Sequence, residues 1–243
     1  MIPKIIHYCW VGNCPKPKSV LYCIESWRKF CPDYRIIEWN ESNYDFSKNK
    51  YMRQAYEAKK WGFVPDYARL DIVYQYGGIY LDTDVEVFKS FDDVLDNESF
   101  WGFEQKNYVA TSTIGSCKHN SLIKMFLDAY NGRQFLKDDG TYDDLTNVAI
   151  ITEILEGIGL KVNGKYQKID GYGTFYPQTY FSPYDYINCR YFISENTYAM
   201  HHFHKSWLSP KLRLKSKIKK IVASLIGGDN IYKLRTLIPF LNE

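Results

Sequence analysis

The sequence of 243 residues lacks the common signatures of phosphate-binding loops and of zinc sites. It contains no Gly-x-Gly-x-x-Gly and no Walker A lysine motif, so phosphate groups would have to be bound without a glycine-rich loop. The six cysteines include no Cys-x-x-Cys pair, which argues against a zinc site. No run of about twenty apolar residues is present, so no transmembrane helix is expected.

The overall composition of the chain predicts a folded cytoplasmic protein. Hydrophobic residues make up 45% of the chain, which is enough for one domain with a full core. Met1 leads directly into an expected strand, so no signal peptide, reduced thiols and a cytoplasmic location are expected. Aromatic residues reach 17%, and their large apolar ring faces suit stacking on sugar rings.

The most informative stretch covers residues 64–87. Within it, residues 66–75 have the apolar spacing of a helix, which Asp66 could cap. Gly77-Gly78 is expected to end this helix. The apolar residues 79–81 then predict a short buried strand.

Two carboxylates follow that strand directly. On a continuing strand, Asp82 and Asp84 would share one face, and their repulsion calls for a cation between them. Mg²⁺ or Mn²⁺ suits oxygen ligands and brings phosphates with it. A bare Asp-x-Asp is more often an acidic turn. The position after a buried strand, where open α/β sheets place ligands, favours a metal–diphosphate site here.

Asp66 and Arg69 lie one helical turn apart and share a helix face. Alone, such a pair is as well explained by a surface ion pair, which contributes little. Beside the paired carboxylates, Arg69 becomes a candidate for contacting phosphate or sugar. Asp66 becomes a candidate for accepting a hydrogen bond from a sugar hydroxyl.

A histidine-rich turn lies near the end of the expected domain, with His201, His202 and His204 followed by Lys205. A neutral imidazole can complete a metal shell begun by two aspartates. Lys205 could neutralise a diphosphate leaving group. A solvated turn explains the histidines equally well when they are considered alone.

These motifs resemble the DXD-type glycosyltransferases of family GT32. The resemblance rests on Asp-Tyr-Ala-Arg-Leu-Asp (66–71) and Tyr-Gly-Gly-Ile-Tyr-Leu-Asp-Thr-Asp (76–84). The opening residues 2–12 and the later 201–207 follow the same pattern. The family includes bacterial capsular polysaccharide transferases and fungal initiating mannosyltransferases. More distantly, the sequence is similar to the catalytic domain of the clostridial glucosylating toxins.

The resemblance assigns roles to individual residues. It implies a metal bound by Asp84, Asp82 and one histidine, for which His202 is predicted and His201 and His204 are alternates. The residues implied in donor binding are Trp10, Asn40, Asp66, Arg69, Asp82, Lys205 and Trp207. The residues implied in catalysis are Asp66, Arg69, Asp82 and Asp84.

Three further residues keep more than one interpretation. Trp10 would stack on the nucleotide base, although on its own it is better explained as a core residue. Asn40 is a candidate for base or ribose contact and equally a turn residue. Asn147 is a candidate sugar contact in residues 145–150, where relatives carry a Gly-Pro segment that this chain lacks.

The expected fold is a GT-A-like α/β nucleotide-diphospho-sugar transferase with a mixed central sheet. The first elements follow the order β-α-β-α-α-β, as in a nucleotide-binding half. Helices are predicted at 18–30, 51–61, 66–75, 121–130 and 146–158. Strands are predicted at 2–10, 34–39, 79–81, 85–88, 100–104, 108–116 and 197–202, and an extended aromatic segment at 172–181.

The last residues, 210–243, differ from the rest in charge. They carry eight Lys or Arg and two acids, a net +6, which leaves −3 for the other residues. Residues 211–226 predict a basic amphipathic helix that binds the inner membrane surface, with docking on the domain as the alternative. Nucleic-acid binding is disfavoured because the domain itself is not basic. We therefore divide the chain into a catalytic domain, 1–209, and a basic helical tail, 210–243.

The predicted function is a metal-dependent, retaining glycosyltransferase. It would use Mn²⁺ or Mg²⁺ and a nucleotide sugar, UDP-linked in preference to GDP-linked. The expected acceptor is a lipid-linked glycan of capsular or other surface polysaccharide synthesis, at the cytoplasmic face of the membrane. A nucleotide-sugar hydrolase and a toxin-like protein glucosyltransferase remain alternatives.

Overall fold

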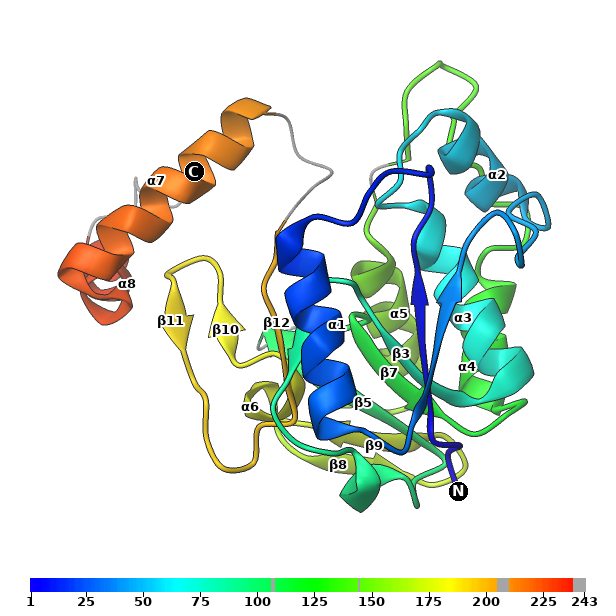
Figure 1. The fold of residues 1–243 in the computed structure, drawn as a ribbon, viewed down its shortest axis with the longest axis horizontal. Coiled ribbons are helices and arrows are strands. Elements are labelled where there is room, and N and C mark those ends of the chain that lie inside the picture. Colours follow the sequence, from blue (N-terminus) through cyan, green and yellow to red (C-terminus); the bar gives the residue numbers. More distant parts are fainter. Residues whose placement is uncertain (106–107, 144, 205–209, 238–243) are drawn as a thin grey trace.

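A mixed eight-stranded sheet forms the centre of the fold, in a computed structural model that describes residues 1–105, 108–143, 145–204 and 210–237. Three neighbouring strands are parallel, and the middle one pairs with both others (Figure 1). In spatial order the strands are β2 (Arg35–Trp39), β1 (Ile5–Cys9), β3 (Gly78–Leu81), β7 (Thr113–Ser116), β5 (Ser99–Gln105), β9 (Gly173–Tyr176) and β8 (Gln167–Ile169), with β6 (Tyr108–Val109) paired to β5.

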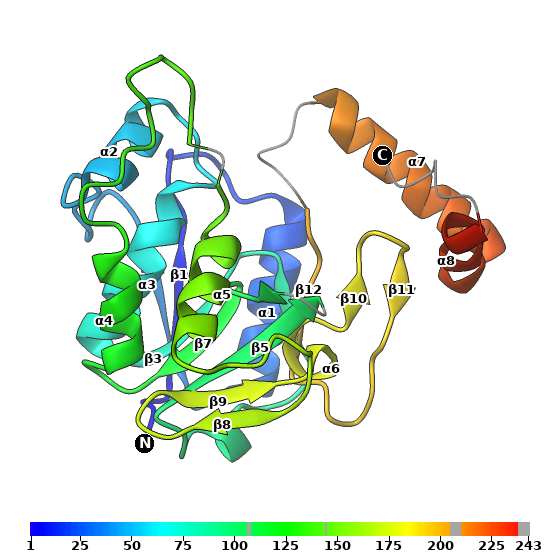
Figure 2. The same cartoon turned by 180° about the vertical axis from the view of Figure 1, so that it is seen from behind.

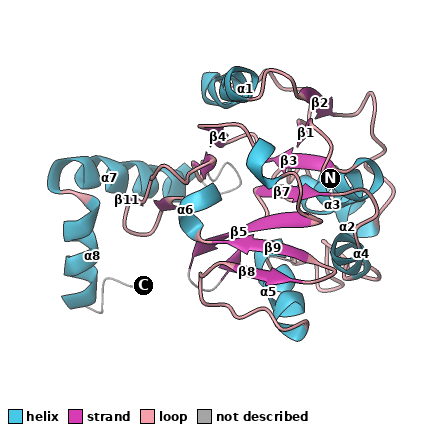
Figure 3. Ribbon diagram, turned by 90° about the horizontal axis from the view of Figure 1, so that it is seen from below, coloured by secondary structure: helices cyan, strands magenta, loops and turns pink. Residues whose placement is uncertain are grey.

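Helices cover both faces of this sheet, as Figure 3 shows from below. The helix α1 (Lys18–Phe30) buries Val20, Ile24 and Trp27, whose spacing places them on one side of a helix. These side chains share a hydrophobic cluster with Ile79 of β3. The cluster on the other face is covered by α2 (Lys50–Glu57), α3 (Val64–Tyr76), α4 (Ser121–Asp128) and α5 (Asn147–Gly157).

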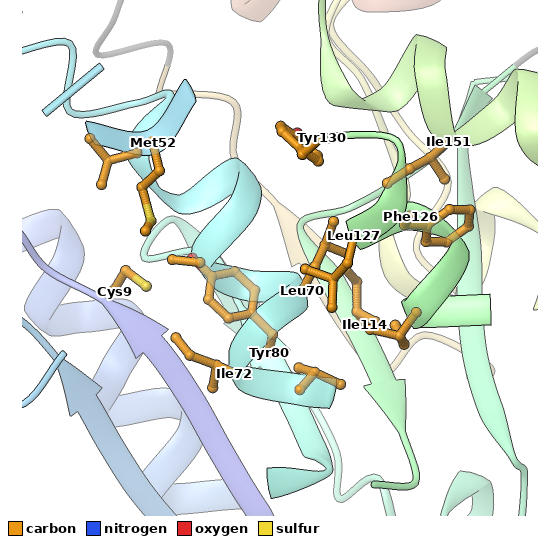
Figure 4. Packing of buried hydrophobic residues seen from close by; sticks show 14 of the residues in the cluster. Cys9, Met52, Leu70, Ile72, Tyr80, Ile114, Phe126, Leu127, Tyr130 and Ile151 are labelled. Carbon is orange, nitrogen blue, oxygen red and sulfur yellow. The ribbon is translucent and has the colours of Figure 1, made fainter. Parts of the chain in front are cut away.

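The strand β3 contributes to both clusters because its side chains alternate. Ile79 and Leu81 belong to the cluster under α1, whereas Tyr80 between them belongs to the cluster under α3. Figure 4 shows Tyr80 packed among Leu70, Ile72 and other residues of that second cluster. A strand that is buried on both faces explains the uninterrupted apolar run in the sequence.

A second, two-stranded sheet continues the chain after β3. It pairs β4 (Val85–Val87) with β12 (Ala199–His201) in antiparallel orientation, so that His201 lies opposite Val85. Between these strands in sequence come η1 (Asp92–Val94), α6 (Gln178–Phe181) and the hairpin β10 (Tyr184–Asp185)–β11 (Arg190–Tyr191). The small sheet therefore joins residues more than a hundred positions apart at the end of β3.

The described part of the tail forms two helices, α7 (Pro210–Ile226) and α8 (Gly228–Leu237). Figures 1 and 2 show both helices at the edge of the molecule, beside β10 and β11. Ala223 is buried against Tyr184 and Cys189, and Ile231 packs on the same cluster. Among the described helices, none is long and apolar enough to cross a membrane.

The structure confirms the predicted α/β class with a mixed central sheet, which fits a GT-A-like fold, and it confirms the basic helix of the tail. Two predicted elements are wrong in detail. The strand expected at 108–116 is divided into β6 and β7, and the extended segment at 172–181 becomes β9 followed by α6. The boundary between domain and tail stays a prediction, because residues 205–209 lie outside the described residues.

Candidate functional site

The carboxyl ends of the three parallel strands meet at one edge of the sheet. Trp10 follows β1, Asn40 follows β2 and Asp82 follows β3. The chain places β2 on one side of β1 and β3 on the other, so a topological switch point lies beside β1. Open α/β sheets bind ligands in the crevice outside the strand ends at such a point. The fold therefore gathers the predicted residues where ligand binding is expected.

Asp82 and Asp84 occupy a tight turn and not a continuing strand, so that part of the sequence prediction is wrong. The backbone N–H of Val85 donates to the carbonyl of Asp82 at 3.0 Å and closes the turn. The turn still brings both carboxylates together, and β12 adds His201. Ligand atoms of Asp82, Asp84 and His201 all lie within 4.8 Å of one another. Two carboxylates and an imidazole at this separation can hold a divalent metal ion.

The electrostatics of this cluster favour a cation. Burial opposes the charge of Asp84, but His201, whose Nε2 lies 3.3 Å from Asp84 Oδ1, and then His204 together outweigh burial and keep the Asp84 pKa well below its usual range. Burial lowers the pKa of His201, but Asp84 more than compensates, so the net shift is upward. The Nδ1 atom of His201 is buried and has no hydrogen-bond partner. Asp84 is thus ionised, and a metal ion could take the place of the proton that His201 shares with it.

The structure favours His201, the alternate, over the predicted His202 as third ligand. The Nε2 atom of His202 lies 2.9 Å from Glu86 Oε2, which directs its ring away from the aspartate pair. Successive residues at a strand end point to opposite faces, so only one of the two histidines can face Asp84. His204 contributes its backbone N–H, which donates to Asp84 Oδ2 at 2.8 Å. The three histidines therefore have three different environments.

Arg69 connects the metal cluster to the first turn of α3. It is only 4% exposed, and its Nη1 donates to Asp82 Oδ2 and its Nη2 to Asp66 Oδ1, each at 3.1 Å. Nη1 also donates to the carbonyl of Thr111 at 2.8 Å. The surface ion pair considered from the sequence is therefore excluded. Thr111 also accepts from Nη1 through its hydroxyl at 3.3 Å, and the sequence gives no signal for it because the contact spans more than forty positions.

Asp66 lies inside the first helical turn and is not the N-cap, a position that Phe63 occupies. Its Oδ1 accepts hydrogen bonds from Arg69 and, at 3.0 Å, from Nδ2 of Asn147. Burial raises the pKa of Asp66 to about 7, although Arg69 opposes the shift. The structure thus brings Asp66, Arg69, Asp82 and Asn147 into one buried polar network. Such perturbed, convergent groups mark a candidate site.

The nucleotide-side candidates lie along the neighbouring strand ends. Trp10 is partly buried, and its Nε1 donates to the carbonyl of Cys14 at 2.7 Å, with Lys16 Nζ 5.6 Å from the ring centroid. Asn40 bonds Glu38 Oε1 at 3.1 Å and also accepts from the Ser42 backbone, so it is a turn residue within a polar cluster. Lys205 and Trp207 lie outside the described residues.

Comparison with known proteins supports a resemblance to DXD-type glycosyltransferases. The family described as glycosyltransferase sugar-binding region containing DXD motif matches residues 17–101. Inositol phosphoceramide mannosyltransferase 3 of Schizosaccharomyces pombe is 27% identical over 130 residues, which cover 50% of this chain and 35% of that protein. Subversion of eukaryotic traffic protein A of Legionella pneumophila is 24% identical over 172 residues, which cover 56% of this chain and 26% of that protein.

The chain is also similar to a solved structure. The glycosyltransferase involved in the glycosylation of the major capsid of PBCV-1 aligns with a TM-score of 0.49 and 11% identity, over 90% of this chain and 100% of that one. The chain spans about a third or less of the length of the two curated relatives above. The matched region 17–101 includes Asp66, Arg69, Asp82 and Asp84.

Proposed function

We propose that this protein is a metal-dependent glycosyltransferase that moves a sugar from a nucleotide diphosphate to a glycan hydroxyl. The observation that carries the proposal is that the candidate metal cluster and the candidate sugar-binding residue Asp66 belong to one connected network. A carboxylate–carboxylate–imidazole cluster, Asp82, Asp84 and His201, is joined through Arg69 to the buried Asp66. A nucleotide sugar whose diphosphate is bound at the metal cluster would place its sugar near Asp66.

Asp82, Asp84 and His201 would hold the metal. Carboxylate oxygens suit both Mg²⁺ and Mn²⁺, and the added imidazole favours Mn²⁺. When bound, the ion supplies Lewis-acid stabilisation of the leaving diphosphate. Arg69 adds a fixed positive charge, already oriented by its hydrogen bonds to Asp82 and Thr111.

The remaining network would orient the donor. Asp66 and Asn147 present acceptor and donor atoms for sugar hydroxyls, and Trp10 presents a ring face for the base. We propose a UDP-sugar, with a GDP-sugar as the alternative. We propose that Lys205 neutralises the diphosphate and that Trp207 closes over the donor.

We infer from the family resemblance that the donor's configuration is retained. In a front-face displacement, the bond from the anomeric carbon to the phosphate oxygen breaks as the bond to the acceptor oxygen forms. The acceptor proton passes to the leaving phosphate, so no enzymic nucleophile is needed. The chain's residues would hold both partners close enough for this step.

We further propose a GT32-type role in capsular or other surface polysaccharide synthesis, at the cytoplasmic face of the membrane and with a lipid-linked acceptor. Support comes from α7, which uses one side to dock and leaves another exposed. Ala223 is buried on the hairpin and Lys219 Nζ donates to the carbonyl of Tyr186 at 2.7 Å. Ile221 and Leu225 are 61% and 80% exposed. An apolar surface flanked by lysines suits an anionic membrane.

A thermal-shift panel of UDP- and GDP-sugars, each with and without Mn²⁺, tests the function. A ligand that binds the native state raises the melting temperature. We expect a metal-dependent shift with one donor, and its loss in Asp84→Asn. The control Asp96→Asn changes an exposed aspartate outside the cluster and should respond like the wild type. The absence of any shift with every nucleotide would contradict the proposal.

The same protein preparation distinguishes the alternatives. A nucleotide-sugar hydrolase would release free sugar without an acceptor as fast as with one. A toxin-like protein glucosyltransferase would transfer to protein in preference to glycan. We expect slow donor hydrolysis and transfer to glycan.

A further inference from the structure

Three buried polar atoms lie together without hydrogen-bond partners. They are the hydroxyls of Tyr51 and Tyr130 and the Nη1 atom of Arg133. Tyr51 and Tyr130 are 0% and 2% exposed, so bulk water does not reach them. Buried polar groups almost always have a partner, and each unpaired one costs about 1–3 kcal/mol. Three such atoms in one place make a candidate site for a polar group.

The three side chains converge from different elements. Tyr51 lies on α2, Tyr130 follows α4, and Arg133 lies in the loop beyond. The two tyrosine rings meet edge to face with centroids 5.2 Å apart. The guanidinium carbon of Arg133 lies 4.5 Å from the Tyr51 ring centroid and 5.1 Å from that of Tyr130. They therefore form one contiguous group.

The guanidinium of Arg133 is already oriented. Its Nε donates to Asp143 Oδ2 and its Nη2 to the carbonyl of Leu145, each at 2.7 Å. These two bonds fix the plane of the group and leave Nη1 directed away from them. The Nη1 position is thus a fixed donor and not a freely moving surface charge.

This group lies beside the first turn of α3, because the ring of Tyr67, the residue after Asp66, meets the Tyr130 ring edge to face with centroids 5.6 Å apart. Burial is the main cause that raises the pKa of both Tyr51 and Tyr130, and the Asp66 carboxylate adds to the rise. Arg133 in turn opposes the upward shift of the Asp66 pKa. Both phenols keep their protons at neutral pH and can therefore donate or accept a hydrogen bond.

The local charge decides which kind of ligand fits. The charge of Arg133 is already balanced by Asp143, and that of Arg69 by Asp66 and Asp82. An additional carboxylate on the ligand would therefore meet guanidinium groups that are already paired with carboxylates. A neutral hydroxyl can both accept from Arg133 and exchange hydrogen bonds with the phenols.

We propose that Tyr51, Tyr130 and Arg133 form a subsite for a second hydroxyl of the donor sugar, beyond the one bound by Asp66. This inference rests on the proposed function. The donor is accordingly a neutral hexose and not a uronic acid. A site built to bond a hydroxyl rejects analogues that lack it, because its buried groups are then left unpaired.

Calorimetric titration in Mn²⁺ tests the subsite with UDP, UDP-glucose, UDP-galactose, UDP-xylose, UDP-glucuronate, GDP and GDP-mannose. The variant Tyr51→Phe/Tyr130→Phe keeps both rings and removes both hydroxyls. We expect it to weaken binding of the preferred nucleotide hexose about tenfold, from two neutral hydrogen bonds, and to leave the free nucleotide unchanged. The control Tyr142→Phe removes a hydroxyl from an exposed ring of the same loop.

The outcomes separate this inference from the proposed function. If neither nucleotides nor nucleotide sugars bind to the wild type, the proposed function fails and the subsite with it. If they bind but the double variant retains wild-type affinity for the hexose donor, only the subsite is overturned. A lowered melting temperature with unchanged donor affinity would show that the hydroxyls bind water. Tighter binding of UDP-glucuronate than of the hexose donors would also overturn the subsite.

Discussion

His201 and His202 differ in what they face, and this difference gives a direct test at the scale of single residues. Nε2 of His201 lies 3.3 Å from Asp84 Oδ1, whereas Nε2 of His202 bonds Glu86. We expect His201→Ala to weaken Mn²⁺ binding at least tenfold, since even indirect partners of metal ligands are worth about 10–100-fold. The matched variant His202→Ala should stay close to wild type. Electron paramagnetic resonance of free Mn²⁺ measures both affinities, and the reverse ranking would restore His202 as the ligand.

Asp66 gives a prediction about stability and pH. Burial raises its pKa to about 7, from about 4 in an unfolded chain. Below about pH 4 the carboxyl is protonated in both the folded and the unfolded state, and the contribution of Asp66 to the free energy of unfolding is at its maximum. As pH rises from about 4 to 7, ionisation costs the folded state progressively more, and above 7 this cost is constant.

The variant Asp66→Asn cannot ionise and should avoid this cost. At pH 8 we expect its free energy of unfolding to exceed that of the wild type by about 2–4 kcal/mol, since one pKa unit is worth about 1.4 kcal/mol. Arg69 keeps Asp82 and Thr111 as partners, so its charge stays paired. Urea titrations at pH 5, 6, 7 and 8 would show the gap growing with pH. A gap that does not change with pH would contradict the raised pKa.

The sequence predicted the residue types of the site better than their environments. Asp82, Asp84, Asp66 and Arg69 were recognisable from their spacing, because the spacing is local. The burial of Arg69 depends on Thr111, more than forty positions later, and no local pattern records that contact. The choice among the histidines depends on the register of β12 against β4, which a run of histidines leaves open.

Among the elements, the Gly77-Gly78 break sets how β3 enters the sheet. Gly78 has a φ of +101°, and a Cβ there would lie 2.7 Å from the carbonyl oxygen of Ile5 and 2.9 Å from His7 Nε2. Gly78→Ala should therefore destabilise the fold by more than the ~1–2 kcal/mol of a left-handed residue alone. Gly132 has a φ of +77° with nothing within 4 Å, so Gly132→Ala isolates the backbone cost. Equal melting temperatures for the two variants would contradict the steric argument.

Element prediction succeeded where local pattern decides and failed where pairing decides. The helix at 18–30 was predicted to the residue, because apolar spacing and the chain break at Cys31-Pro32 are local. The strand at 108–116 was predicted whole but is divided, since among the described strands β6 pairs with β5 alone whereas β7 also pairs with β3. Long-range pairing therefore sets the strand boundaries.

At the scale of the whole molecule, the tail docks on the domain, whereas membrane binding stays a prediction. One side of α7 is held on the β10–β11 hairpin by Ala223 and Lys219, and α8 adds an ion pair between Asp229 and Arg190 at 2.7 Å. The other side carries exposed Ile221 and Leu225. Docking thus fixes the direction in which these apolar side chains point and leaves them exposed.

This arrangement predicts that membrane binding can be removed without undocking the tail. Ile221→Glu/Leu225→Glu replaces two exposed apolar side chains and leaves Ala223 and Lys219 in place. We expect the wild type to sediment with vesicles containing phosphatidylserine, and the double variant to bind at least tenfold more weakly, since each buried side chain contributes about 1.5–3 kcal/mol. The control Leu21→Glu alters an exposed apolar residue of α1 and should bind normally. Retained sedimentation of the double variant would contradict the membrane role, whereas equal wild-type binding to vesicles of phosphatidylcholine alone would remove only its electrostatic part.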